Sequence, residues 1–203
     1  MLHFCQFKAS VSSELECKKV LQTIIDRWGR IDILVNNAGV MDNMKGVTET
    51  DNELWQHVLD VNLNGPMYLM RSVIPLMLEN AEEHKGVVVN VSSVTSLRGA
   101  ISGAAYCTAK TALNALGRNT AWMYRNDGIR CNTVLPGGVE SNIIKNSQSS
   151  FDPSKTDYPQ KPMHNCAVGM CSTLDVAESI LYLITATSVN GEELVIDRGW
   201  MMA

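Results

Sequence analysis

The chain of 203 residues has 17 basic and 21 acidic residues, which gives a net charge of −4. Because its basic residues are also scattered, the sequence argues against a nucleic acid or an anionic membrane as partner. With a hydrophobic content of 45% it can bury one sizeable core, so we expect a single domain over residues 1–203. No apolar run approaches the ~18 residues of a membrane span, and the start lacks the pattern of a signal peptide, so the sequence predicts a cytoplasmic protein.

The first elements are predicted to form a β-α-β unit. Residues 2–7 indicate a short strand. Ser13 and Glu16 then have the spacing of a capping box, and apolar residues follow at helical intervals until a glycine ends them. Residues 31–35 are an apolar run, which is typical of a parallel strand that is buried on both faces.

A long helix is predicted over residues 51–80, opened by a second capping box at Thr50 and Glu53. Pro66 lies inside it, and a helical proline removes the hydrogen bond to the carbonyl four residues back, which belongs to Asn62. We therefore expect a kink at this point and a carbonyl that is free to hold a water molecule.

Three further strands and two further helices are predicted in the rest of the chain. The strands are expected at residues 87–92, 129–135 and 193–197, and the helices at 104–124 and 172–185. Small residues form a stripe on the helix at 104–124, which suits close contact with a second subunit or inside the protein. Residues 138–172 hold three of the six prolines and form too long a segment for a plain connection, so we expect a substrate lid.

Tyr106 and Lys110 stand four residues apart on the predicted helix and therefore share a face. A free phenol has a pKa of about 10, and a neighbouring ammonium favours its ionised form. Lowering that pKa by about three units requires about 4 kcal/mol. A partly buried lysine together with a cationic cofactor ring could supply this energy, whereas a surface lysine could not. Taken alone, the pair is also typical of a solvated helix face.

Other polar motifs stand at the ends of predicted strands, where open α/β sheets place their sites. In chain order the motifs are Asn36-Asn37-Ala38-Gly39, Asn62, Ser93, Tyr106-x-x-x-Lys110 and Pro136-Gly137. Together they resemble the short-chain dehydrogenase/reductase family over nearly the whole chain. The resemblance is to members of the kind of 3-oxoacyl-acyl-carrier-protein reductase and glucose dehydrogenase.

The resemblance implies an α/β fold with a three-layer, Rossmann-type parallel sheet. It implies hydride transfer that interconverts a carbonyl and a secondary alcohol of a small molecule, with NAD or NADP as cofactor. It also implies a homo-oligomer formed through the helices at 51–80 and 104–124.

Roles for single residues follow from the same resemblance. Tyr106 would be the general acid or base, Lys110 would lower its pKa and bind the nicotinamide ribose, and Ser93 would donate a hydrogen bond to the substrate oxygen. Asn62 would complete a proton relay. The cofactor-binding positions implied are Val11, Asn37, Ala38, Gly39, Tyr106, Lys110, Pro136, Gly137 and Val139, the last of these beside the carboxamide.

The start of the sequence departs from the family pattern. Members open with a strand and a Gly-rich turn that binds the pyrophosphate at a helix N-terminus, and no such cluster is present. The resemblance therefore implies that the first two strand–helix units, on the order of 50 residues, are absent. The strand at 31–35 would then expose an apolar edge, which the strand at 2–7 could cover. Ser10 also stands where the family usually has an adenine-contacting aspartate. The resemblance implies that the choice between NAD and NADP is encoded largely in the missing part, so the sequence does not distinguish them.

Six cysteines without a Cys-x-x-Cys motif indicate reduced thiols. His164, Cys166 and Cys171 are close together, but a structural zinc ion needs four ligands, so no metal site is predicted.

Two functions stay open at this point: a dehydrogenase/reductase, or a non-catalytic remnant that associates with intact relatives. The complete set of catalytic residues favours the enzyme, and the missing turn favours inactivity. The missing turn predicts that the chain of 203 residues binds neither NADH nor NADPH at micromolar concentration.

Overall fold

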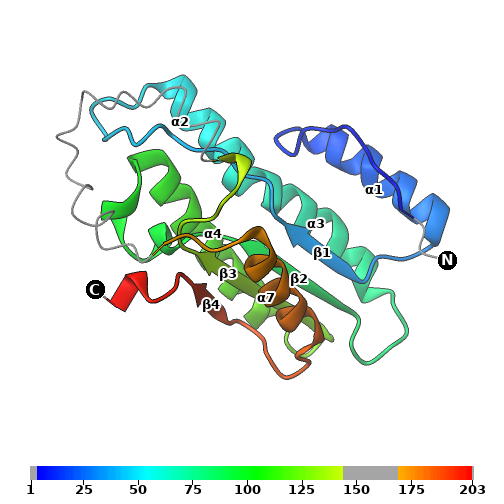
Figure 1. Cartoon of the computed structure of the whole chain (residues 1–203). Coiled ribbons are helices and arrows are strands. Elements are labelled where there is room, and N and C mark those ends of the chain that lie inside the picture. Colours follow the sequence, from blue (N-terminus) through cyan, green and yellow to red (C-terminus); the bar gives the residue numbers. More distant parts are fainter. Residues whose placement is uncertain (1–3, 144–168, 203) are drawn as a thin grey trace.

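Four short apolar segments pair side by side to form the sheet at the centre of the protein (Figure 1). The computed structural model describes residues 4–143 and 169–202. The strands are β1 (Ile33–Asn36), β2 (Gly86–Val91), β3 (Ile129–Pro136) and β4 (Glu193–Ile196), in that order across the sheet. Every neighbouring pair is parallel, which confirms the predicted α/β fold with a Rossmann-type sheet.

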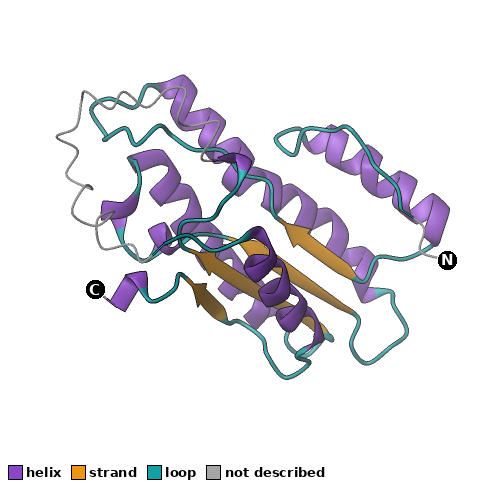
Figure 2. Cartoon of the chain, in the orientation of Figure 1, coloured by secondary structure: helices purple, strands orange, loops and turns teal. Residues whose placement is uncertain are grey.

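Helices cover both faces of this sheet, so the protein has three layers (Figure 2). The α-helices of the described residues are α1 (Glu14–Trp28), α2 (Asn52–Leu59), α3 (Gly65–Leu78), α4 (Ala104–Met123) and α7 (Thr173–Thr185), and the short helices are η1 (Asp60–Asn64), η2 (Val94–Ser96), η3 (Gly99–Ile101) and η4 (Trp200–Met202). α3 and α4 pack on one face, α7 packs on the other, and α1 packs against α3.

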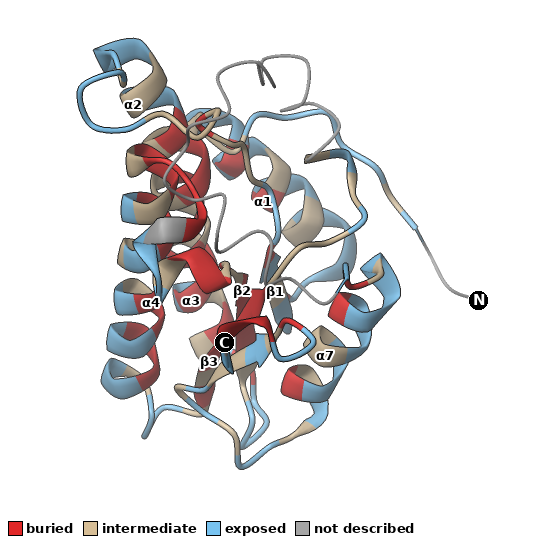
Figure 3. Cartoon of the chain, turned by 60° about the vertical axis from the view of Figure 1, so that its left-hand side comes forward, coloured by how far each residue is buried: buried red, intermediate tan, exposed pale blue. Residues whose placement is uncertain are grey.

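Alternate residues of β2 supply the two halves of the core. Val88 points toward Met70 and Ile74 of α3, whereas Val87 and Val89 pack on the α7 side. Figure 3 shows buried residues along the side of α4 that faces the sheet. Full burial of each such aliphatic side chain contributes about 1.5–3 kcal/mol to folding.

Two of the predicted helix starts are confirmed. At α1 the hydroxyl of Ser13 accepts the N–H of Glu16 (3.3 Å), although the Glu16 carboxylate bonds the N–H of Ser10 (2.8 Å) rather than that of Ser13. At α7 the capping box is complete, with Ser172 Oγ and Asp175 Oδ2 each accepting the other residue's N–H.

The predicted capping box at Thr50 and Glu53 is wrong. The N-cap of α2 is Asp51, whose carboxylate accepts the N–H of Leu54 at 2.8 Å. Thr50 instead donates its hydroxyl hydrogen to the carbonyl of Gly46 (2.8 Å), which closes the preceding turn. An ionised carboxylate is the stronger acceptor at a helix N-terminus, and this preference decides between the adjacent candidates.

The helix predicted over residues 51–80 is interrupted at the point where Pro66 was expected to break it. The five residues of η1 form a π-helical turn between α2 and α3, and the N–H of Gly65 bonds the carbonyl of Asp60, five residues back. Pro66 follows in the first turn of α3, where its missing N–H is tolerated. The widened turn therefore confirms the predicted break in the helix.

The predictions for the start of the chain are corrected in two respects. Residues 4–7 form no strand, and Phe4 is 85% exposed, so they do not cover β1. β1 pairs only with β2 among the described strands, and Ile33 and Val35 are 46% and 38% exposed rather than buried on both faces. The apolar edge that the resemblance implied is therefore present.

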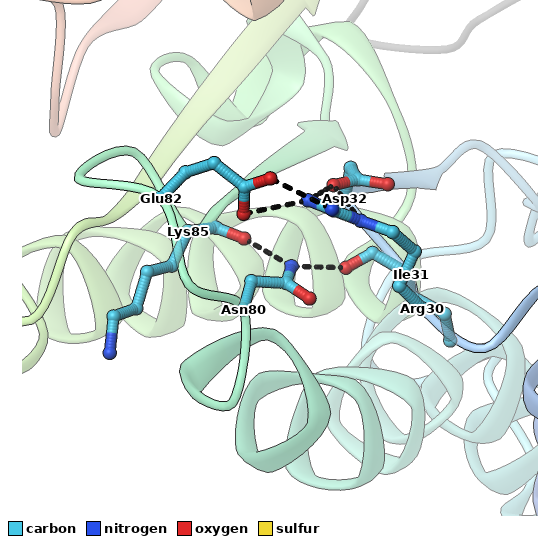
Figure 4. Close-up of polar contacts among 6 residues, drawn as sticks. All are labelled: Arg30, Ile31, Asp32, Asn80, Glu82 and Lys85. Carbon is cyan, nitrogen blue, oxygen red and sulfur yellow. Dashed lines mark hydrogen bonds and ion pairs between the residues drawn. The ribbon is translucent and has the colours of Figure 1, made fainter.

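Asn80 joins the segments that lead into β1 and β2 (Figure 4). Its side-chain amide donates to the carbonyls of Ile31 (3.0 Å) and Lys85 (2.7 Å). On the surface beside it, Arg30 forms ion pairs with Asp32 (2.6 Å) and Glu82 (2.8 Å). These contacts fix how the two strands start relative to each other.

The stripe of small residues on α4 faces the protein interior. Ala105 and Ala109 are completely buried against Val58 of α2, and Thr120 is 5% exposed. These three residues of the stripe pack inside the protein, whereas Ala112 and Leu116 are half-buried, and a homo-oligomer through these helices stays a prediction.

Several other predictions concern residues that the structure describes only in part. The segment 144–168, which includes most of the expected lid and both His164 and Cys166, lies outside the described residues. Within those residues the five cysteines are free thiols, and no group of three or more metal-ligating side chains is placed to hold an ion. No helix in the described part of the chain is long and apolar enough to cross a bilayer.

Candidate active site

A cavity of about 710 Å³ opens at the carboxyl ends of β1, β2 and β3. Parallel strands place their ends at one edge of the sheet, which is where open α/β folds bind ligands. The predicted site residues that line the cavity are Asn37, Ala38, Gly39, Ser93, Tyr106, Lys110, Pro136, Gly137 and Val139.

Tyr106 lies in the first turn of α4, where it is 7% exposed, and it lines the cavity together with Ser93. Ser93 is held in turn as the N-cap of η2, accepting the N–H of Thr95 at 3.2 Å. Burial raises the pKa of the Tyr106 phenol well above 10, the hydrogen bond from Ser93 lowers it, and the carboxylate of Asp42 raises it further. The chain therefore keeps the phenol protonated at neutral pH, as a general acid requires.

Lys110 shares a face of α4 with Tyr106, as predicted, and its Nζ lies 5.5 Å from the centroid of the Tyr106 ring. It is 3% exposed and donates a hydrogen bond to the carbonyl of Val91 (2.8 Å). Burial lowers the pKa of Lys110 to about 8. The buried ammonium of Lys110 alone does not offset the rise that burial causes in the pKa of the Tyr106 phenol. This agrees with the expectation from the sequence that a cationic cofactor ring must supply a second positive charge.

Asn62 lies in the π-helical turn and is completely buried behind the cavity wall. Its Oδ1 accepts the N–H of Val40 (3.2 Å), and its Nδ2 donates to the carbonyls of Val40 and Val58 (2.9 Å each). The side chain is therefore engaged by backbone groups, and a relay through its own carbonyl stays a prediction.

Val11 lies against Gly65, at the start of α3. A Cβ on Gly65 would stand 2.9 Å from its carbonyl oxygen, so the two backbones meet closely there. Val11 is not among the described residues that line the cavity, and its part in binding a cofactor stays a prediction.

The cavity residues fit the nicotinamide half of a dinucleotide. A Cβ on Gly39 would lie 3.0 Å from Oδ1 of Asn62 and 3.7 Å from Nζ of Lys110, so glycine lets this loop pass close to both. Lys110 has three N–H donors, and the hydrogen bond to Val91 uses one of them. An ammonium, a phenol and a hydroxyl on an otherwise mainly apolar wall can bind ribose hydroxyls and a polarised oxygen.

Sequence reasoning missed one buried charge and most of the apolar wall. Asp42 accepts the backbone N–H of Tyr106 from a loop 64 residues away, and no local pattern marks it. The apolar side chains of the wall include Met41, Met44, Ile101, Val176, Ile180 and Trp200. These residues come from four separate segments, so only the fold brings them together.

Comparison with known proteins decides the family. Residues 3–201 match the family model described as Enoyl-(Acyl carrier protein) reductase. The chain belongs to the short-chain dehydrogenase/reductase family. It is 34% identical over 202 residues to the short chain dehydrogenase adrF of Penicillium rubens, covering 95% of this chain and 78% of that protein. It is 33% identical to 3beta-hydroxysteroid dehydrogenase 2 of Eggerthella lenta, covering 95% and 74%.

Solved structures agree with this assignment. Levodione reductase superposes with a TM-score of 0.84 at 28% identity, covering 96% of this chain and 76% of that one. ElxO with NADP bound gives 0.82 at 26% identity, with 97% and 78% covered. The predicted family and fold are confirmed, and with them the general class of NAD(P)-dependent oxidoreductase acting on small molecules.

Proposed function

We propose that this short-chain dehydrogenase/reductase interconverts a carbonyl and a secondary alcohol, with Tyr106 as the acid or base. The observation that carries the proposal is the meeting of three side chains in one cavity. Tyr106 and Ser93 line this cavity together, and the buried ammonium of Lys110 stands 5.5 Å from the Tyr106 ring.

In the direction of reduction, the chemistry that a nicotinamide dinucleotide would supply beside Lys110 and Tyr106 is the transfer of a hydride to the carbonyl carbon. Tyr106 Oη gives its proton to the carbonyl oxygen, which becomes the alcohol. Ser93 Oγ donates a hydrogen bond to the same oxygen as negative charge develops on it. The ammonium of Lys110 favours the phenolate that remains, and Asn62 holds the loop that carries Gly39 and Val40.

The apolar wall supports a neutral, largely apolar substrate. Met41, Met44 and Ile101 line the cavity together with Trp200, and Lys110 is the one charged side chain among its described lining residues. Solved and curated relatives include a levodione reductase and a 3beta-hydroxysteroid dehydrogenase, names that point to alicyclic ketones and alcohols. The bound NADP of ElxO supports the use of a nicotinamide dinucleotide.

The experiment follows NADH or NADPH oxidation with a panel of alicyclic ketones, alongside Tyr106→Phe. The dinucleotide is varied up to millimolar concentration, and its binding is measured separately by nicotinamide fluorescence. Loss of the acid should lower turnover by about 100-fold or more, since general acid–base catalysis contributes roughly 10²–10⁴.

Binding of the dinucleotide should survive in Tyr106→Phe, because the ring and its packing are kept. Turnover by Tyr106→Phe within tenfold of the parent would exclude the proposed role of the phenol. Absence of turnover in the parent with a saturated cofactor would exclude the activity on the compounds tested.

A further inference from the structure

Asp42 is fully buried beside the active site, and the proposed mechanism gives it no part. It lies in the loop between β1 and α2, three residues beyond Gly39. Acidic side chains are almost never fully buried unless they are paired or hydrogen-bonded. Two backbone groups meet this need: the N–H of Tyr106 donates to Oδ2 (2.8 Å), and that of Met44 donates to Oδ1 (3.2 Å).

The first turn of α4 is capped from this loop rather than from its own sequence. The N-cap is Gly103, which has no side chain to accept a hydrogen bond. The N–H of Ala104 donates instead to the carbonyl of Lys45 (2.9 Å), and the N–H of Tyr106 donates to Asp42. Both donors belong to the first turn, whose N–H groups have no partner within the helix. A carboxylate is also favoured at the positive end of the helix dipole.

The contact between the loop and the helix is tight. A Cβ on Gly103 would lie 2.5 Å from Oδ2 of Asp42 and 2.6 Å from the carbonyl oxygen of Lys45. The loop also holds Asn43 and Met44 at φ of 57° and 59°, in the left-handed region. That region costs non-glycine residues roughly 1–2 kcal/mol each, and such backbone persists where surrounding contacts impose it.

Asn62 fixes the other end of the same loop. Its amide makes two hydrogen bonds to the backbone of Val40, two residues before Asp42. The loop is therefore held between the π-helical turn and the start of α4. Through this loop, Asn62, to which the family resemblance assigns the proton relay, is connected to Tyr106, the proposed acid.

We propose that Asp42 is a positioning residue that holds the first turn of α4, and thereby the phenol of Tyr106, in place for proton transfer. This inference rests on the proposed function of Tyr106. Because the carboxylate bonds the backbone of the acid itself, its loss displaces Tyr106 before it disturbs the rest of the helix.

The test compares Asp42→Ala, which removes the cap, with Asp42→Asn, which keeps the size and one acceptor oxygen. Asp51→Asn is the matched control, because Asp51 caps α2 through the same type of bond at an exposed position. Hydrogen exchange of the Tyr106 amide, followed by NMR, reports the cap without any need for turnover. kcat and the KM for the dinucleotide are measured alongside.

We expect the Tyr106 amide to exchange at least about tenfold faster in Asp42→Ala, with Asp42→Asn between it and the parent, while amides in the middle of α4 keep their protection. kcat should fall by about tenfold or more in Asp42→Ala, with partial recovery in Asp42→Asn and a nearly constant KM. Asp51→Asn should leave both readouts at the parent's values.

Unchanged exchange at Tyr106 in both Asp42 variants would overturn the inference, as would equal losses of protection throughout α4. If the parent shows no turnover, the proposed function fails, and the exchange data alone then support or overturn the placement of Asp42.

Discussion

Lys110 carries its positive charge at a buried position, which is unfavourable for an ammonium group. Its ammonium is buried in the cavity wall, and among the described residues its hydrogen-bond acceptor is the carbonyl of Val91. Burial lowers its pKa to about 8, because the charged form loses hydration. Strongly shifted groups in a cleft are typical of functional sites, and proteins accept the loss of stability there.

This cost predicts a distinctive dependence of stability on pH. The pKa of Lys110 is lower in the folded protein, about 8, than in the unfolded chain, about 10.5. Between these values the unfolded state binds more protons, so the free energy of unfolding should rise with pH, by up to about 1.4 kcal/mol per unit. The parent is compared with Lys110→Met by urea unfolding from pH 7 to 10.

The difference in the free energy of unfolding between the parent and Lys110→Met separates the contribution of Lys110 from those of the other titrating groups. Burial raises the pKa of the Cys107 thiol to about 11 and that of Cys131 to about 12, which lowers stability at alkaline pH in both proteins alike. The parent should therefore gain stability relative to Lys110→Met as pH rises from 8 to 10. Parallel curves over this range would show that Lys110 is not perturbed.

Among single residues, the sequence was informative where the chemistry is local. Tyr106 and Lys110 share a face because they are four apart on a helix, and Ser93, which follows the end of β2, lines the same cavity. Asp42 could not be found in this way. Its partner is 64 residues distant, and only the folded loop shows that Gly103 leaves the first turn of α4 without a cap of its own.

At the scale of elements, the junction between α3 and β2 depends on one buried amide. Asn80 is 9% exposed and bonds two carbonyls that belong to different strand starts, whereas the Arg30 ion pairs beside it are exposed. Buried hydrogen bonds cost more to break than surface ion pairs, since the partners that remain lose hydration without replacement.

Asn80→Ala should therefore lower the free energy of unfolding by about 1–3 kcal/mol. Glu82→Gln, which removes one partner of an exposed ion pair, should cost less than Asn80→Ala, because surface ion pairs contribute little to stability. Urea unfolding followed by tryptophan fluorescence checks both. Equal effects of the two substitutions would mean that Asn80 does not join the strands in solution.

Elements defined by local signals were predicted well, and elements that need a partner were not. The capping residues Ser172 and Asp175 start α7, and Pro66 interrupts the long helix where expected. Residues 4–7 have the composition of a strand but form none, because a strand also requires a neighbour to complete its hydrogen bonds. The same dependence on neighbours explains why β1 is exposed although its composition is that of a buried strand.

At the scale of the whole molecule, the edge at β1 is the most exposed part of the sheet. β1 pairs with β2 alone among the described strands, and Ile33 and Val35 present apolar side chains to solvent. An apolar edge strand is a template for pairing with another chain, and proteins usually protect such edges with charge, especially lysine. This chain has no lysine within the four residues of β1.

We therefore predict that Ile33→Lys lowers aggregation of the protein. Val35 is left unchanged because it also lines the cavity.

The control is Leu15→Lys, which adds the same charge at a 63% exposed position of α1. Light scattering during warming at equal protein concentration measures the onset of aggregation. If edge pairing drives the process, Ile33→Lys delays that onset and Leu15→Lys does so much less, since each variant changes the net charge of −4 by the same single positive charge. An equal delay in the two variants would assign the effect to charge and not to the edge of the sheet.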